Sequence, residues 1–381
     1  MILNQGAFYL LAFMTVGSLL AASLFIANDD GALSQTGIAT KKIASLLASL
    51  WFISAFLGVV LKVAQILDAP FLDALDGTTL NSYLTQTDLG RAMFFQIIAL
   101  GILVMSLPFI KRVLPLILLL GISLIALIAP IFQSHAAANG SHGLAIGSLV
   151  THVVALSLWV GGLLGILLIS REDRTFALHR FSALALWSAI AVVLSGLATA
   201  WTRLNDKSAW GTQYSYVVIT KVVFTVALLA MGYANRKALK SRDEVRLQEL
   251  LRLITVEAMV MVSVVLMGSW LSQIQPPIGD TSNLSSAQLI IGMETPPPPN
   301  LINLLKLYNP DALMIALLVT AVALYIKGVV VLKSRGDSWP VGRTIAFAIG
   351  IALIDFATSG GLGVYALFSF EYHMMAHMLL G

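Results

Sequence analysis

The chain has 381 residues, of which 58% are hydrophobic and only 11% are charged, and it contains no cysteine. Soluble domains carry about 25% charged residues, so this sequence has too few charges to cover a water-facing surface and predicts an integral membrane protein. The absence of cysteine excludes disulfides, thiolate metal sites and iron–sulfur clusters. Any soft-metal chemistry would therefore use histidine, methionine or carboxylate ligands. The net charge of +4 reflects membrane topology, and we expect no nucleic-acid partner.

About eleven runs in the sequence are long and apolar enough to cross a bilayer, which takes about 20 residues as a helix. No run reads as a strand, so we predict an all-α, polytopic transmembrane helical bundle. The first run has no Lys or Arg before it and is expected to stay as a helix rather than act as a cleaved signal. The predicted spans are residues 5–27, 43–67, 91–110, 113–132, 144–169, 181–201, 215–235, 253–274, 311–332, 344–358 and 363–381.

Lysine and arginine are distributed unevenly between the two sides of these spans. Alternate loops, at 41–42, 111–112, 171–180, 236–252 and 333–343, hold sixteen of them, whereas the opposite loops hold only four. Cytoplasmic loops are enriched in Lys and Arg, so the sequence predicts that the first set is cytoplasmic and that the N-terminus lies outside.

The loop between the eighth and ninth spans differs from the others because it is long and contains four successive prolines, Pro296–Pro299. Such a run favours an extended spacer without internal hydrogen bonds. We predict an eight-span membrane domain over 1–275, an external Pro-rich linker over 276–309, and a second, partial membrane domain over 310–381. The last apolar run has no basic residue to close it, so we expect the chain to be part of a longer protein.

Five of the six histidines fall in the outer half of the predicted bundle. His135 and His142 lie in an uncharged external loop, and His152 lies about 12 Å into the fifth span from its outer end. His373 and His377 lie at a similar distance behind an outward-facing turn. This distribution fits a ligand that arrives from outside.

His373 and His377 are spaced i and i+4, so on a helix both imidazoles can reach one metal ion. Met374 and Met378 form a second such pair on the adjacent face. Imidazole suits copper or zinc and thioether suits Cu(I), so the sequence predicts a copper ligand set. The alternative is that the methionines fill gaps between helices and the histidines make ordinary hydrogen bonds.

Other ionisable side chains lie within predicted spans, where they are costly and therefore candidates for function. His152 is followed by Trp159 on nearly the same face and by Gly161 and Gly162, which allow close helix packing. It can be a metal ligand or a hydrogen-bonded structural group.

Three further intramembrane charges are Lys221, Glu257 and Asp355. We expect Lys221 and Glu257 to lie too far apart in depth to form a pair. Glu257 can instead meet arginines at the cytoplasmic edge. Asp355 can carry protons, neutralise a cation, or be protonated and hydrogen-bonded.

The region from His135 to Pro277 resembles the copper resistance protein D (CopD) family of bacterial inner-membrane proteins. The first four spans resemble this family mainly in hydropathy. The residues that carry the resemblance are Ser134-His135-Ala136, His152, Leu158–Leu163, Arg180-Phe181-Ser182, Ser195-Gly196, Lys221, Asn235-Arg236, Glu257 and Pro276-Pro277.

The C-terminal module resembles the start of a CtaG-type cytochrome c oxidase assembly protein, a membrane family associated with copper supply to terminal oxidases. Gly363-Val364-Tyr365, Leu367-Phe368-Ser369, His373-Met374 and His377-Met378 carry this resemblance. Phe370-Glu371-Tyr372 departs from the family pattern. Together the two resemblances imply copper handling in the bacterial inner membrane, with copper, a periplasmic copper chaperone, a terminal oxidase subunit and membrane lipid as partners.

The leading hypothesis is a copper permease or delivery protein, not an enzyme. Copper would be captured by His135 and His142, passed to His152, and then conducted inward or handed to His373 and His377. The oxidation state of the copper, Cu(I) or Cu(II), stays open. Two alternatives are a membrane cytochrome that binds haem b through two histidines, which normally come from different helices, and an oxidase-assembly scaffold that binds no metal.

Overall fold

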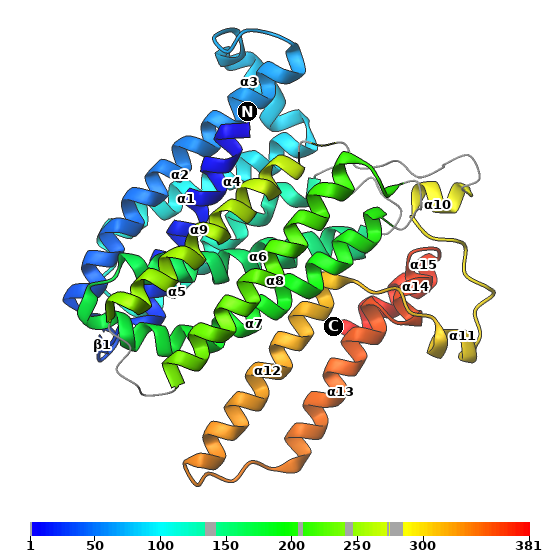
Figure 1. The fold of residues 1–381 in the computed structure, drawn as a ribbon. Helices are drawn as coiled ribbons and strands as arrows, with labels where there is room; N and C mark the ends of the chain where they lie inside the picture. Colours follow the sequence, from blue (N-terminus) through cyan, green and yellow to red (C-terminus); the bar gives the residue numbers. More distant parts are fainter. Residues whose placement is uncertain (1, 134–141, 205–208, 241–246, 273, 275–284) are drawn as a thin grey trace. The chain divides into compact units, whose positions relative to one another are not determined.

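The computed structural model describes residues 2–133, 142–204, 209–240, 247–272, 274 and 285–381, and it is almost entirely helical (Figure 1). Within these residues, ten helices are long and apolar enough to cross a membrane. The predicted all-α, polytopic class is therefore confirmed. The orientation with the N-terminus outside stays a prediction.

The elements follow the chain in an order that matches the first ten predicted spans. They are α1 (Ile2–Leu20), the π-helical turn η1 (Ala21–Phe25), β1 (Asn28–Asp29), β2 (Ala32–Leu33), α2 (Gln35–Leu67), η2 (Asp73–Leu75), α3 (Gly77–Gln86), α4 (Asp88–Ser106), η3 (Leu107–Phe109), α5 (Val113–Ile128), η4 (Ala129–Gln133), α6 (His142–Leu168), α7 (Arg171–Leu204), α8 (Gln213–Lys240), α9 (Leu247–Leu271), α10 (Ser286–Ile290), α11 (Leu301–Lys306), α12 (Ala312–Ser334), α13 (Val341–Thr358), α14 (Gly361–Ala366) and α15 (Phe370–Leu380).

The chain divides into two compact units. The first comprises residues 1–134 and 152–279, and the second comprises residues 135–151 and 280–381. In the first unit α1 packs against α2, α5 and α9, α2 packs against α4, and α8 packs against α9 (Figure 1). The predicted domain limits at 275 and 310 stay predictions.

Polar caps define where several of the helices begin. Ser34 accepts a hydrogen bond from the backbone amide of Gly37 at the start of α2, and Thr87 does the same for Gly90 at the start of α4. Asp311 caps α12 through the amide of Met314. These side chains satisfy amides that have no partner within the helix, which is why the helices start there.

A two-residue hairpin joins α1 to α2 and was not predicted from the sequence. Asn28 pairs with Leu33 and Asp29 with Ala32 across the turn residues Asp30 and Gly31. Both turn residues have positive φ, 52° and 79°, which is the backbone of the tight turns that Asp-Gly favours. The amide of Leu33 also donates to the carbonyl of Lys111, so the hairpin ties the start of α2 to the segment before α5.

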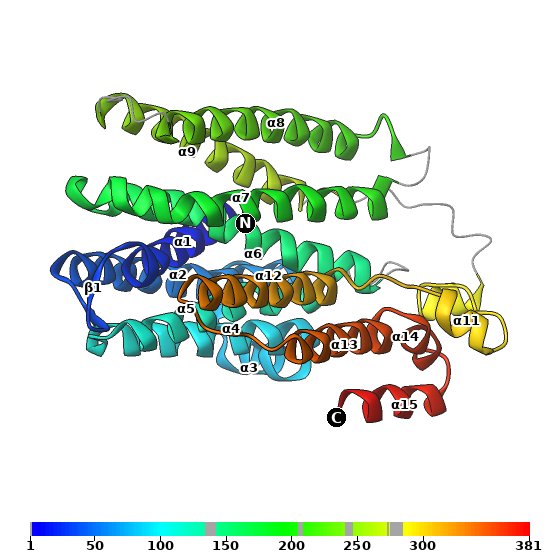
Figure 2. The same ribbon diagram turned by 90° about the horizontal axis from the view of Figure 1, so that it is seen from below.

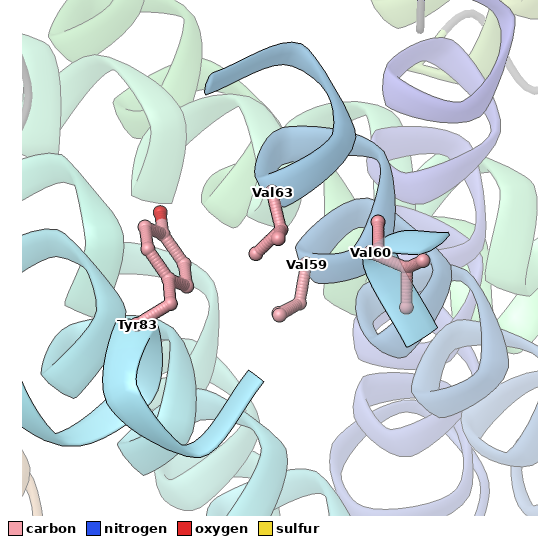
Figure 3. Packing of buried hydrophobic residues seen from close by; sticks show 5 residues of the cluster. Val59, Val60, Val63 and Tyr83 are labelled. Carbon is pink, nitrogen blue, oxygen red and sulfur yellow. The ribbon is translucent and has the colours of Figure 1, made fainter. Parts of the chain in front are cut away.

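The short helix α3 is anchored to the membrane helices by a small apolar cluster. Val59, Val60 and Val63 of α2 are buried with Ala74 and Tyr83, and Figure 3 shows the Tyr83 ring beside the valines. Burial of this apolar surface stabilises an element that lies outside the predicted spans and does not cross a bilayer by itself.

Glycines allow α6 to cross α1 in direct backbone contact. A Cβ at Gly161 would lie 2.4 Å from the carbonyl oxygen of Phe13, and one at Gly165 would lie 2.2 Å from that of Gly17. Gly17 faces the same crossing, because its own Cβ would lie 1.7 Å from the carbonyl of Gly161. The close approach expected at Gly161 is confirmed, and its partner is α1.

The eleventh predicted span is corrected by the structure. Residues 361–380 form two helices, α14 and α15, separated by a turn at Leu367–Ser369, as Figure 2 shows. α15 comprises the 11 residues Phe370–Leu380, so the apolar run is not one continuous helix. Ser369 is extended (φ −137°, ψ 129°), which breaks the helix although the sequence there is apolar.

The segment predicted as a linker has structure of its own in the described residues after 284. It contains α10 and α11, and the prolines between them have no regular secondary structure. Its carbonyls are used as well, because the Tyr365 hydroxyl of α14 donates to Pro297 over 2.8 Å and the Asn303 amide donates to Pro298 over 3.0 Å. Gly361 packs on the backbone of Leu304. The Pro-rich segment thus has contacts within the second unit, and its role as a linker between two membrane domains stays a prediction.

Candidate metal centre

His152 lies in α6 and contacts α7 through one ring nitrogen. Its Nδ1 is 3.1 Å from the carbonyl oxygen of Val192 and 3.1 Å from the hydroxyl oxygen of Ser195. The Ser195 hydroxyl donates its own hydrogen to the carbonyl of Ala191. Both groups that face Nδ1 therefore act as acceptors, so Nδ1 carries the proton.

Protonation at Nδ1 leaves the lone pair of a neutral imidazole on Nε2. Within the described part of the chain, Nε2 forms no hydrogen bond. In many metal sites the histidine binds the metal through Nε2 and donates its Nδ1–H to a backbone carbonyl. This hydrogen bond fixes the tautomer and the orientation of the ring. The same contact also satisfies a structural histidine, so the geometry permits ligation without requiring it.

Gly196 fixes the position of the His152 ring against α7. A Cβ at Gly196 would lie 3.3 Å from Cε1 and 3.5 Å from Nδ1 of His152. Two motifs that are far apart in the sequence, His152 on α6 and Ser195-Gly196 on α7, thus meet in one place. Trp159, two turns further along α6, is 5% exposed and belongs to the core.

Lys221 of α8 is close enough to His152 to interact with it electrostatically. Its Nζ lies 3.4 Å from where a Cβ of Gly268 on α9 would be. Glu257 of α9 is buried, and its Oε1 lies beside Gly232 of α8. This contact is at the other end of the α8–α9 pair from Lys221. Residues 221 and 232 are about 16 Å apart along α8 at 1.5 Å per residue, so Lys221 and Glu257 do not pair, as predicted.

His135 and His142 cannot be placed in this cluster. His135 lies outside the described residues, and of His142 only the backbone, at the first position of α6, is described. Their predicted roles as ligands stay predictions.

α15 brings His373 and His377 together at its exposed side. Their Nε2 atoms are 3.1 Å apart and the rings meet edge to face. Ala376 and Tyr372, on an adjacent face of the helix, pack against Ala357 and Leu362. Both histidines are exposed.

The two methionines of α15 are also accessible. Met374 is 41% and Met378 81% exposed among the residues described, and the two readings of the pair stay predictions. The pair of histidines was expected at hydrocarbon depth within an eleventh span, and this depth stays a prediction.

Asp355 of α13 accepts a hydrogen bond from the Tyr308 hydroxyl over 3.1 Å. Partial burial and, after it, the Asp355 carboxylate raise the pKa of Tyr308 above its ordinary value, so the phenol stays a donor. The hydrogen bond expected for Asp355 is observed, and the three roles predicted for it stay predictions. Tyr308 is a partner that sequence reasoning missed, because it lies 47 residues away in a segment interpreted as a linker.

No group of three or more His, Asp or Glu side chains that could hold a metal ion occurs among the residues the structure describes. The described candidates are therefore one imidazole at His152 and two at α15, with methionines beside the latter. These are open ligand sets rather than closed cages.

Comparison with known proteins gives three matches in chain order. Residues 1–144 match "Copper resistance protein D-like, N-terminal domain", and residues 176–271 match "Copper resistance protein D". Residues 323–381 match "Cytochrome c oxidase caa3 assembly factor (Caa3_CtaG)". Ser195, Lys221 and Glu257 fall in the second match and the α15 histidines in the third, whereas His152 falls between the first two.

Curated relatives are found in mycobacteria. Uncharacterized proteins of Mycobacterium bovis and Mycobacterium tuberculosis are each 35% identical over 100 residues, and one of Mycobacterium leprae is 31% identical over 100 residues. The matched stretch covers 26% of this chain and 15% of each relative. No solved structure matches the chain.

These matches and the ten apolar helices indicate a multi-pass membrane protein. They also confirm the resemblance that the motifs indicated, including the first four spans, where only hydropathy had suggested it. The chain joins copper resistance protein D sequence to Caa3_CtaG sequence at its C-terminal side.

Proposed function

We propose that this chain binds copper in the bacterial inner membrane through histidine and moves it across the membrane or supplies it for cytochrome oxidase assembly. The observation that carries the proposal is the His152 ring, whose Nδ1–H is held by Val192 and Ser195 so that Nε2 is left as a ligand. The family matches to copper resistance and oxidase assembly proteins support copper as the ion.

A second copper site is proposed on α15. Two metal–nitrogen bonds of about 2.05 Å at a tetrahedral angle place the nitrogens about 3.3 Å apart. The 3.1 Å between the Nε2 atoms of His373 and His377 is close to that separation. Copper would bind both Nε2 atoms, and the hydrogen of the Nε2–H···Nε2 contact would move to Nδ1 of its own ring, so that both rings stay neutral. Met374 or Met378 would add a thioether, which favours Cu(I).

Sites with one or two imidazoles suit transfer rather than storage. Conduction requires a site that attracts an ion but does not trap it, and a closed four-ligand cage would trap copper. We propose binding and transfer without covalent chemistry, with a periplasmic copper chaperone as donor and a terminal oxidase subunit as acceptor.

The proposal is tested by adding Cu(I) to the purified full chain in detergent and measuring bound copper and the absorption spectrum. We expect copper to be retained at His152 and at α15, without a Soret band. A Soret band in protein purified from cells that make haem would support the cytochrome instead. A chain that holds neither copper nor haem would support the metal-free scaffold.

Ser195→Ala tests how His152 is oriented. The substitution removes one of the two acceptors of Nδ1–H while the ring itself remains, and loss of such a partner typically costs 10–100-fold in metal affinity. We expect the copper affinity of His152 to fall by about tenfold with the stoichiometry unchanged, measured by competition with a Cu(I) chelator. Ser123→Ala is the matched control, because Ser123 is a buried serine of α5 that bonds only to its own helix. An unchanged affinity in Ser195→Ala would mean that Ser195 does not orient the ligand.

A further inference from the structure

A basic pocket lies at the start of α2, within the first unit. Its volume is about 290 Å³, and its lining includes the side chains of two lysines and two serines from α2. The residues that line it are Lys41, Lys42, Ser45, Leu46, Ser49 and Pro108. Pockets that enclose a drug-sized ligand measure about 300–1,000 Å³, so this one fits a headgroup rather than a whole large ligand.

Lys41 is a buried cation at the base of the pocket. It is 6% exposed, and its Nζ donates to the carbonyls of Pro108 over 3.1 Å and of Ile110 over 2.9 Å. An ammonium group has three N–H donors, so one remains for a ligand. The charges that act on Lys41 are those of Lys42 and Lys111, and both are positive.

The serines add hydrogen-bonding capacity next to these charges. The hydroxyl of Ser49 donates to the carbonyl of Ser45 over 3.0 Å. The Ser45 hydroxyl itself has no hydrogen-bond partner among the described residues and lines the pocket. Positive charge combined with a hydroxyl donor is the chemistry that recognises a phosphate oxygen.

An exposed apolar stripe continues from the pocket along α2. Leu46, Leu50 and Ile53 follow Lys42 at helical spacing, and they are 63%, 42% and 60% exposed. α2 is one of the helices long and apolar enough to cross a membrane, so in a bilayer these side chains would face acyl chains rather than water. The positive charge of the pocket matches the anionic headgroup of a phospholipid, and the exposed apolar stripe matches its acyl chains.

We propose that this pocket binds an anionic phospholipid, with its phosphate at Lys41, Lys42 and Ser45 and an acyl chain along Leu46 and Leu50. Basic pockets at the ends of membrane helices bind anionic headgroups by this combination of charge and depth. A free phosphate ion would use the same charges but would gain nothing from the apolar stripe. The proposal does not depend on copper binding.

The test is native mass spectrometry of the detergent-solubilised full chain titrated with phosphatidylglycerol or with phosphatidylcholine of the same acyl chains. We expect phosphatidylglycerol to bind more tightly than phosphatidylcholine. Lys42→Gln should weaken the binding of phosphatidylglycerol about fivefold, because one lysine near a membrane surface contributes about that much. Lys62→Gln is the matched control, because it removes the same charge from the other end of α2, where Lys62 contacts only Gln65. Lys41 is left intact because its two hydrogen bonds join α2 to η3.

Equal binding of the two lipids, or an equal effect of Lys42→Gln and Lys62→Gln, would overturn the proposal. Displacement of phosphatidylglycerol by excess inorganic phosphate would also overturn it, because the pocket would then be a site for free anions.

Discussion

Replacing His377 with alanine is expected to abolish chelation of copper by α15. The two Nε2 atoms stand 3.1 Å apart, so in the proposed site both would bind one ion, and either imidazole alone would bind far more weakly. The loss should exceed the roughly 10–100-fold that follows removal of an outer-shell partner. The measurement is competition for Cu(I) with a chelator, made in a His152→Ala background so that only α15 is observed.

Two variants of the same helix separate the ligands from their neighbours. Met375→Leu removes an exposed thioether outside the predicted pairs and should leave copper affinity unchanged. Met374→Leu should weaken Cu(I) but not Cu(II), because thioether prefers the reduced ion. If His377→Ala and Met375→Leu bind copper equally well, α15 has no chelating histidine pair.

Gly161→Ala is expected to destabilise the first unit severely. The added Cβ would lie 2.4 Å from the backbone carbonyl of Phe13, so α1 and α6 would have to move apart. Forced overpacking of this kind costs about 3 kcal/mol or more, because backbone atoms cannot rotate away as a side chain does. We expect little folded protein, or a markedly lower thermal midpoint in detergent.

Gly121→Ala provides the matched control for this substitution. Gly121 also lies within a membrane helix, α5, but an added Cβ there would meet nothing within 4 Å. That variant should be as stable as the parent or more stable by about 0.5–1 kcal/mol, since alanine is the better helix former. Equal stability of the two variants would contradict the close crossing of α1 and α6.

Hydropathy predicted ten membrane helices well because an apolar stretch of about 20 residues has few alternatives to a helix. It failed after Gly361, where the sequence is just as apolar but Ser369 is extended and divides the run into α14 and α15. The break coincides with contacts from Leu304 and Pro297, which come from distant parts of the chain. No local pattern could have revealed those contacts.

The sequence was enough to name the candidate side chains but not the groups that contact them in the folded chain. The spacing of His373 and His377 was enough to expect that the two rings meet, because a helix fixes that geometry by itself. For His152 the sequence could not show that Val192 would accept the Nδ1 proton, since any residue offers a carbonyl. Asp355 likewise found its partner, Tyr308, only through tertiary packing.

The most direct test of the account is the copper content of the purified full chain after loading with Cu(I), compared among His152→Ala, His373→Ala/His377→Ala and the triple variant. We predict that each of the first two loses one of the two proposed sites and that the triple variant retains none of them. His179→Ala, which removes an exposed histidine of α7, should retain all the copper of the parent. Copper content that is the same in His152→Ala, in the triple variant and in the parent would contradict the claim that His152 Nε2 is a copper ligand.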